Sequence, residues 1–198
     1  MSLATAPSRQ AVANVIGHYA KQVDITFQVV GSSENAGTGF VGLAVNREKT
    51  SEENPAFFDP NDKSIRMNIA GGKLSSKMYD YNNLLSVLLH EKDHKQRDEP
   101  SMTDRNLGHM SHAFTYFAGV ANDNFLGGTE DFQGGVLNQM ATEMNGALED
   151  GHSENEVLDL ARKTNTAIAK TGFHFRYEAP SNPTENGKFS LGRTEKKK

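Results

Sequence analysis

The N-terminal part of the chain carries a helical hydrophobic pattern followed by two strand-like segments. From Ser8, the stretch SRQAVANVIGHYAKQ spaces its apolar residues by three and four positions, which predicts an amphipathic helix. The stretches DITFQVVG (24–31) and GFVGLAVN (39–46) are rich in β-branched and aromatic residues and are bounded by Gly, Ser and Asn, so they predict strands. The polar stretch between them, GSSENAGT, predicts a loop.

An alternating segment follows the turn signal DPND. In SIRMNIA (64–70), three apolar residues fall on one face, and Arg66 and Asn68 fall on the other. This period of two predicts a half-buried strand. Because its second face is polar, we expect this strand at the edge of a sheet.

Helical patterns dominate the second half of the chain. Asp80 is placed to cap a helix that runs through Lys95, and Pro100 interrupts the pattern that follows. A helix at 102–123 is expected to bury Leu107, Met110, Phe114, Phe117 and Ala121. The remaining predicted elements are helices at 130–149 and 153–168 and a strand at 172–180.

This order of elements predicts an α+β fold, with an N-terminal helix and a small mixed sheet before a helical C-terminal half. We expect one domain over residues 1–180. Residues 181–198 are polar and contain Pro, Asn and Lys, so we expect a disordered tail.

Composition excludes some classes of function. The formal net charge of −4 argues against non-specific electrostatic binding of nucleic acid. No apolar run reaches the roughly 18 residues of a membrane span. The first residues lack the pattern of a secretion signal, so we expect a cytoplasmic protein or one exported without a conventional leader. With no cysteine in the chain, any zinc site must use His, Asp or Glu.

The motif HEKDH (90–94) is the strongest chemical signal in the sequence. On a helix, His90 and His94 lie on one face and can both bind a single cation. Glu91 lies about 100° round the helix, where it can act as a general base toward water. The alternative is an amphipathic helix whose polar end spells the motif by chance. The apolar run before it, YNNLLSVLL, favours a buried helix and therefore a metal site.

With this motif and the strand before it, the chain resembles the zincin metallopeptidases, which carry H-E-x-x-H on the active-site helix. In zincins a sheet with an antiparallel edge strand precedes that helix. The arrangement of SIRMNIA, GGKLSSKMYDYNN and the motif helix looks similar. The resemblance implies one zinc per chain, and it implies that residues 64–70 line the cleft and pair with the substrate backbone.

A catalytic zinc needs a third protein ligand and an open position. The segment LGHMSHAFTYFAGV offers His109 and His112, and the helical spacing puts His112 and Tyr116 on one stripe. HAFTYFAGV also resembles the third-ligand segment of SprT-like and WLM-like zincins, where an aromatic residue follows the ligand His by four positions. That match implies His112 as the ligand and Tyr116 as the aromatic, a candidate donor to the developing oxyanion. His109 and a carboxylate such as Asp123 or Glu143 stay open as alternatives.

The resemblance implies a zinc-dependent endopeptidase that acts on a protein or peptide. Minimal zincin domains of this size occur as toxins or effectors of bacterial secretion and injection systems, which implies a cognate inhibitor or immunity protein as a partner. The alternative is a catalytically inactive zincin scaffold with a binding or structural role. The intact Glu91 disfavours that alternative, because a purely structural site needs no general base.

Overall fold

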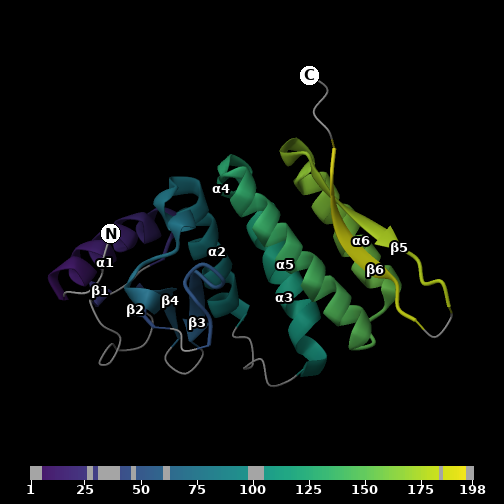
Figure 1. Cartoon of the computed structure of the whole chain (residues 1–198), viewed down its shortest axis with the longest axis horizontal. Helices are drawn as coiled ribbons and strands as arrows, with labels where there is room; N and C mark the ends of the chain where they lie inside the picture. Colours follow the sequence, from purple (N-terminus) through teal and green to yellow (C-terminus); the bar gives the residue numbers. More distant parts are fainter. Residues whose placement is uncertain are drawn as a thin grey trace. The chain divides into compact units, whose positions relative to one another are not determined.

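The computed structural model describes residues 6–25, 29–30, 41–45, 48–59, 63–97, 105–182 and 185–194. The chain divides into two compact units, residues 1–99 and 100–198. A four-stranded sheet belongs to the first unit, whereas the second is mainly helical and ends in a two-stranded hairpin (Figure 1). This segregation confirms the predicted α+β class. The expectation of one domain over 1–180 stays a prediction.

The first unit consists of a small mixed sheet with one helix before it and one after it. Its elements are α1 (Ala6–Ala20), β1 (Val29–Val30), β2 (Val41–Ala44), β3 (Ala56–Asp59), β4 (Ser64–Asn68) and α2 (Tyr81–Arg97), with 3-10 turns at Lys21–Val23, Ala70–Gly72 and Ser76–Tyr79. The strand order is β1-β2-β4-β3, with β3 antiparallel to β4 and the other pairs parallel. Helix α1 packs on β1 and β2, and α2 packs on β3 and β4. The sheet therefore has the expected antiparallel edge strand.

The edge position predicted for residues 64–70 is wrong, because β4 lies inside the sheet and β3 forms the edge. The polar face that suggested an edge is covered by neighbouring protein groups. Arg66 forms an ion pair with Asp59 of β3 at 3.3 Å. Asn68 is completely buried. Alternation identified the strand, but it could not distinguish solvent from a polar neighbour.

The buried Asn68 side chain holds the loop that leads into β3. Its Nδ2 donates to the carbonyl oxygens of Lys49, Thr50 and Asn54 at 3.1, 3.2 and 2.9 Å. Its Oδ1 accepts from the backbone N–H of Ala70 at 2.9 Å. A buried amide must satisfy its polar atoms within the protein, and these loop groups do so. Asn68 therefore connects the C-terminal end of β4 to the segment that positions the edge strand.

A second connection joins the loop before β3 to the turn before α2. The Glu52 carboxylate accepts from the backbone N–H of Ser76 at 2.7 Å and from the hydroxyls of Ser75 and Ser76 at 2.9 and 3.1 Å. The N–H of Ser76, with these hydroxyls and the charge of Lys77, lowers the pKa of Glu52 below its ordinary value. The ionised carboxylate thus fixes the chain just ahead of the motif helix.

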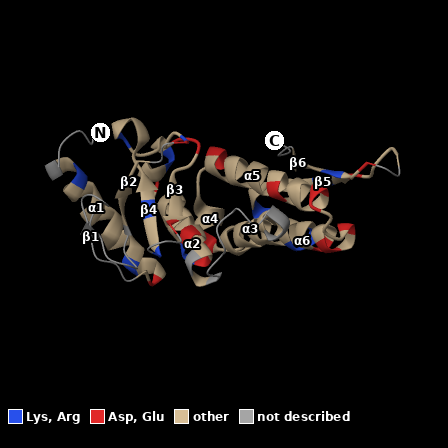
Figure 2. Ribbon diagram, turned by 90° about the horizontal axis from the view of Figure 1, so that it is seen from below, with Lys and Arg blue, Asp and Glu red and all other residues tan. Residues whose placement is uncertain are grey.

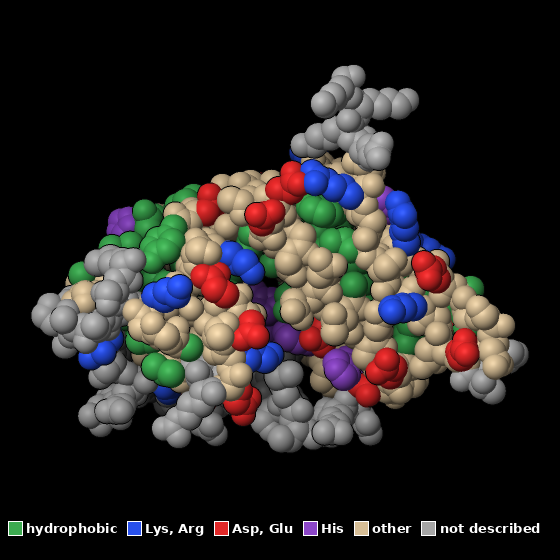
Figure 3. Space-filling view, viewed as in Figure 1, with side chains coloured by type: hydrophobic (Ala, Val, Ile, Leu, Met, Phe, Trp, Pro, Cys, Tyr) green, Lys and Arg blue, Asp and Glu red, His purple; other side chains and the backbone are tan. Residues whose placement is uncertain are grey.

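Helix α2 is also attached to the end of α1. The Tyr81 hydroxyl donates to Gln22 Oε1 at 2.7 Å, and its ring meets that of Tyr19 edge-on at 5.5 Å. Lys92 Nζ donates to the carbonyl of Val23 at 2.7 Å. Tyr81 is nevertheless one of the exposed large hydrophobic side chains. Hydrophobic side chains are visible among polar and charged ones on the face of the molecule drawn in Figure 3. These contacts fix the orientation of α2 at both ends.

The second unit packs a helical layer against a hairpin. Its elements are α3 (Arg105–Val120), α4 (Asp123–Gly127), α5 (Glu130–Glu149), α6 (Glu154–Ala167), β5 (Phe173–Glu178) and β6 (Lys188–Arg193), with a 3-10 turn at Ala169–Thr171. Helix α3 packs on α5 and α6, while β6 lies on α5 and β5 lies on α6 (Figure 1). The fully buried side chains include Leu137, Met140, Met144, Leu160, Ile168 and Phe189.

Two sequence predictions for this unit are wrong. The tail predicted for 181–198 contains β6, which pairs antiparallel with β5. Phe189 supplies the apolar contact that a polar composition obscured, since it is buried against distant segments. The core face predicted for α3 is wrong in part: Met110 is buried as expected, but Phe114 and Phe117 are only half-buried and Ala121 is exposed. Ala113 and Val120 are buried instead. The side chain of Leu107 lies outside the described residues.

Two asparagine side chains hold the outer edges of the hairpin. Asn165 of α6 accepts from the N–H of Phe175 at 2.6 Å and donates to its carbonyl at 3.1 Å. Asn145 of α5 makes the same pair of bonds with Phe189, at 2.7 and 3.0 Å. Each amide takes the place of a neighbouring strand, so both edges are closed near their middle.

Charges are distributed over both units (Figure 2). Acidic residues occupy the first turns of α5 and α6, where the helix dipole favours negative charge. In the described part of the chain, no helix is long and apolar enough to cross a membrane.

Candidate metal centre

Helix α2 presents the motif from a buried helical core. The Asp80 side chain accepts from the N–H of Asn83 at 3.0 Å, as a capping residue does, so the predicted helix start is confirmed. The apolar residues that precede the motif, Leu84, Leu85, Val87 and Leu88, are buried. They anchor the N-terminal half of α2, and the polar motif occupies the turns that follow.

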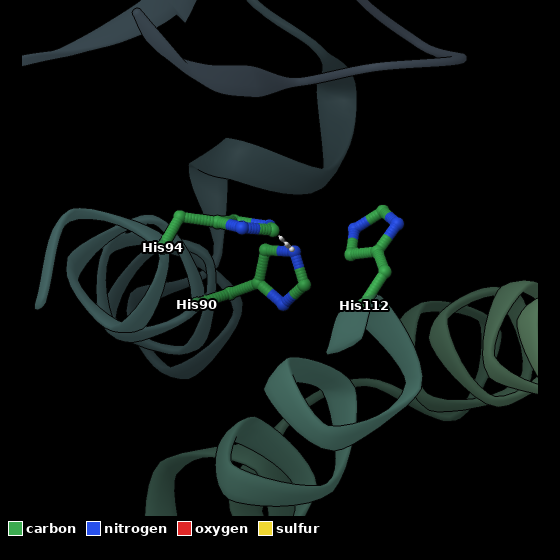
Figure 4. Close-up of side chains that lie close together, drawn as sticks. All are labelled: His90, His94 and His112. Atoms are coloured by element: carbon green, nitrogen blue, oxygen red, sulfur yellow. Dashed lines mark hydrogen bonds between the residues drawn. The ribbon is translucent and has the colours of Figure 1, made fainter. Parts of the chain in front are cut away.

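The first two candidate ligands meet on one face of α2. His90 Nε2 and His94 Nε2 lie 3.1 Å apart, and the rings are nearly perpendicular at 82° (Figure 4). Both side chains are half-buried. Two nitrogens bound to one tetrahedral zinc at about 2.0–2.1 Å would lie roughly 3.3 Å apart. The pair therefore fits two ligands of one ion without rearrangement of the helix.

Glu91 is the buried acid of the motif. Only 6% of its surface is exposed, although glutamate is almost never buried unless it is paired. A chance motif on a solvated helix end would leave this carboxylate in water. The burial of Glu91 beside two half-buried imidazoles instead agrees with a functional site.

The third candidate, His112, belongs to α3 in the second unit (Figure 4). Its Nδ1 lies 3.2 Å from Glu143 Oε1 of α5. Its ring is tilted 32° to that of Tyr116, with centroids 4.8 Å apart, so the predicted stripe of the two residues on α3 is present. The role of Tyr116 in catalysis stays a prediction.

His109 has a different environment from His112. Its Nδ1 lies 2.8 Å from Asp150 Oδ2, and the side chain is 43% exposed. The ring packs so closely on Gly146 that a Cβ there would lie 2.6 Å from two of its atoms. These contacts join α3 to the C-terminal end of α5, and the choice of His112 over His109 as the third ligand stays a prediction.

The carboxylate alternative Asp123 and two further histidines have surroundings of their own. Asp123 is exposed in the first turn of α4. His18 contacts the ring of Tyr19, and His174 accepts from Arg176 Nε at 3.0 Å.

Sequence reasoning considered Glu143 only as a ligand and missed its contact with His112. No short-range pattern reveals that contact, because the two residues lie on different helices. It follows from the packing of α3 on α5.

Comparison with known proteins assigns the family. A family model described as metallopeptidase toxin 2 matches residues 4–176. Comparison with curated proteins and with solved structures found no match. The matched segment contains the motif helix and α3, and the family description implies a metal and a peptidase activity, as the sequence predicted. The chain belongs to the metallopeptidase toxin 2 family.

Proposed function

We propose that the protein is a zinc-dependent endopeptidase in which His90, His94 and His112 bind the metal. The observation that carries the proposal is the pair of imidazole nitrogens 3.1 Å apart on α2, next to a buried glutamate, in a chain of a metallopeptidase family. Each of the three histidines offers one ring nitrogen as a ligand atom. Zinc suits an all-imidazole donor set, and three protein ligands leave the open position that catalysis needs.

A bound zinc would supply positive charge that lowers the pKa of a water molecule and polarises the peptide carbonyl. Glu91 is the general base: its carboxylate accepts a proton from the attacking water and then passes it to the nitrogen of the leaving amine. The Tyr116 hydroxyl is proposed to donate a hydrogen bond to the negatively charged oxygen that develops from the substrate carbonyl.

The edge strand β3 is the proposed binding site for the substrate backbone. It takes the place expected for residues 64–70, because β3 is the antiparallel strand at the edge of the sheet and packs on α2. An edge strand presents unpaired N–H and C=O groups to which an extended peptide can add as a further strand. This recognition selects unfolded or loop segments of proteins as substrates.

The family description as a metallopeptidase toxin supports a protein substrate. We propose that this substrate lies in a target cell, which the protein reaches through a secretion or injection system. We further propose a cognate immunity protein, because a peptidase toxin endangers the cell that makes it. Co-expression with the neighbouring gene products of its own locus tests this partner: the expected result is a complex that blocks proteolysis. Unchanged proteolysis in every such complex contradicts it.

Glu91→Gln tests the mechanism. The zinc-loaded protein and this variant are incubated with a cell lysate, and new protein N-termini are identified by chemical labelling and mass spectrometry. The wild-type protein is expected to produce new N-termini that a chelator suppresses. Loss of a general base slows such a reaction about 10²- to 10⁴-fold, so the variant should produce almost none. The same N-termini at an unchanged rate from Glu91→Gln would disprove the role of Glu91.

A further inference from the structure

The contact between His112 and Glu143 joins two helices within the second unit. His112 lies on α3, Glu143 lies on α5, and these helices pack on each other. His112 Nδ1 is buried and lies 3.2 Å from Glu143 Oε1, a close histidine–carboxylate contact whose angle is not that of a hydrogen bond in this structure. Their side chains are only 19% and 13% exposed. A carboxylate in this setting needs a donor or a positive charge close to it.

We propose that Glu143 is a positioning residue for the metal site: after a small rotation of the ring its carboxylate accepts the Nδ1–H of His112, which presents Nε2 as the ligand atom. The proposal rests on the proposed function and adds a residue to it. A neutral imidazole carries one proton on two nitrogens, so an acceptor at Nδ1 leaves the lone pair on Nε2. Once formed, this bond would fix the plane of the ring and limit its rotation about the side-chain bonds.

Charge balance favours the same assignment. Three neutral imidazoles would bring no negative charge to a divalent ion, so the site would carry its full positive charge in a half-buried setting. Glu91 supplies one negative charge on α2, and Glu143 supplies another behind His112. A carboxylate behind a ligand histidine also raises the basicity of the imidazole and strengthens its bond to the metal.

The second unit provides a matched control for this contact. His109 of α3 and Asp150, the residue that caps the C-terminus of α5, form a second histidine–carboxylate pair, which is a hydrogen bond of 2.8 Å. That pair is more exposed, and His109 packs on Gly146 rather than beside Tyr116. If histidine–carboxylate pairs act only as fasteners between α3 and α5, the two pairs should respond alike to mutation. If Glu143 positions a ligand, only its loss should change metal binding.

The test compares Glu143→Ala, Glu143→Gln and Asp150→Ala with the wild-type protein. Zinc affinity is measured by competition with a fluorescent chelator. The ring ¹⁵N shifts of His112 report its tautomer in the metal-free protein, at a pH where the imidazole is neutral. Glu143→Ala should weaken zinc binding about 10- to 100-fold and release the tautomer preference. Glu143→Gln keeps a neutral acceptor, so its zinc affinity should lie between those of the wild-type protein and Glu143→Ala. Asp150→Ala should bind zinc as the wild-type protein does.

Several results would overturn the proposal, and they differ from failure of the proposed function. Wild-type zinc affinity in both Glu143 variants, with zinc lost in His112→Ala, would leave the peptidase site standing and remove the role of Glu143. Loss of all zinc from both Glu143 variants, with zinc retained by His112→Ala, would make Glu143 the ligand itself. If Glu143→Ala does not fold, Glu143→Gln and the tautomer measurement still decide. A wild-type protein that binds no zinc would reject both proposals.

Discussion

Replacement of Asn68 by Ala should destabilise the first unit more than any exposed substitution of the same type. The amide has two donor hydrogens shared among three loop carbonyls, and its oxygen accepts one backbone N–H, so about three full hydrogen bonds are lost. At a net value of about 1 kcal/mol each, the loss is about 3 kcal/mol. The space left by a completely buried side chain raises it to about 4 kcal/mol. Native stabilities are typically about 5–15 kcal/mol, so this is a large fraction.

The assay is hydrogen exchange in increasing urea, followed in peptides from residues 63–97 so that the first unit is observed by itself. Asn14→Ala is the control, since Asn14 is exposed on α1 and bonds only within that helix to Gln10; its effect should stay within about 0.5 kcal/mol. Asn68→Asp should be at least as harmful as Asn68→Ala at neutral pH, because a carboxylate would face the three carbonyls. A loss below about 1 kcal/mol for Asn68→Ala would refute the reasoning.

Two further predictions concern the connections of each unit. Because the pKa of Glu52 is lowered in the folded protein, the ionised carboxylate stabilises the fold at a pH above its ordinary pKa of 4.5, and this stabilisation is lost as the pH falls through the folded pKa. Glu52→Gln should therefore lose less stability on acidification than the wild-type protein, as measured by urea unfolding. Equal pH profiles of the two proteins would contradict this prediction. Asn145→Ala and Asn165→Ala should each lower the free energy of unfolding by about 1–3 kcal/mol, because backbone groups at a strand edge lose their hydrogen-bond partner. Amide hydrogen exchange should become faster at Phe189 in the first variant and at Phe175 in the second, and unchanged exchange at both amides would count against the edge closure.

Local patterns were sufficient for the elements that carry the chemistry. The motif helix, its Asp80 cap and its buried apolar half follow from spacing and composition, and the family assignment agrees with the peptidase expected from His90, Glu91 and His94. These features are local in sequence, so short-range rules reach them.

Features that depend on residues far apart in the chain could not be predicted from local sequence patterns. The interior position of β4 depends on Asp59 and on the loop carbonyls that satisfy Asn68, and neither is visible in the alternation of residues 64–70. The segment of β6 is polar overall, but Phe189 is buried and its backbone N–H donates to Asn145 of α5, which stabilises the strand. The contact between His112 and Glu143 likewise requires the packing of two helices.

The central claim is tested most directly by the zinc content of four purified proteins: the wild type, His94→Ala, His112→Ala and His109→Ala. Metal per chain is measured by mass spectrometry of the native proteins after zinc loading and desalting. The account predicts one zinc per chain in the wild type and in His109→Ala, and none in His94→Ala or His112→Ala. Full zinc content in His94→Ala would contradict the account. So would full zinc content in His112→Ala together with loss of zinc in His109→Ala.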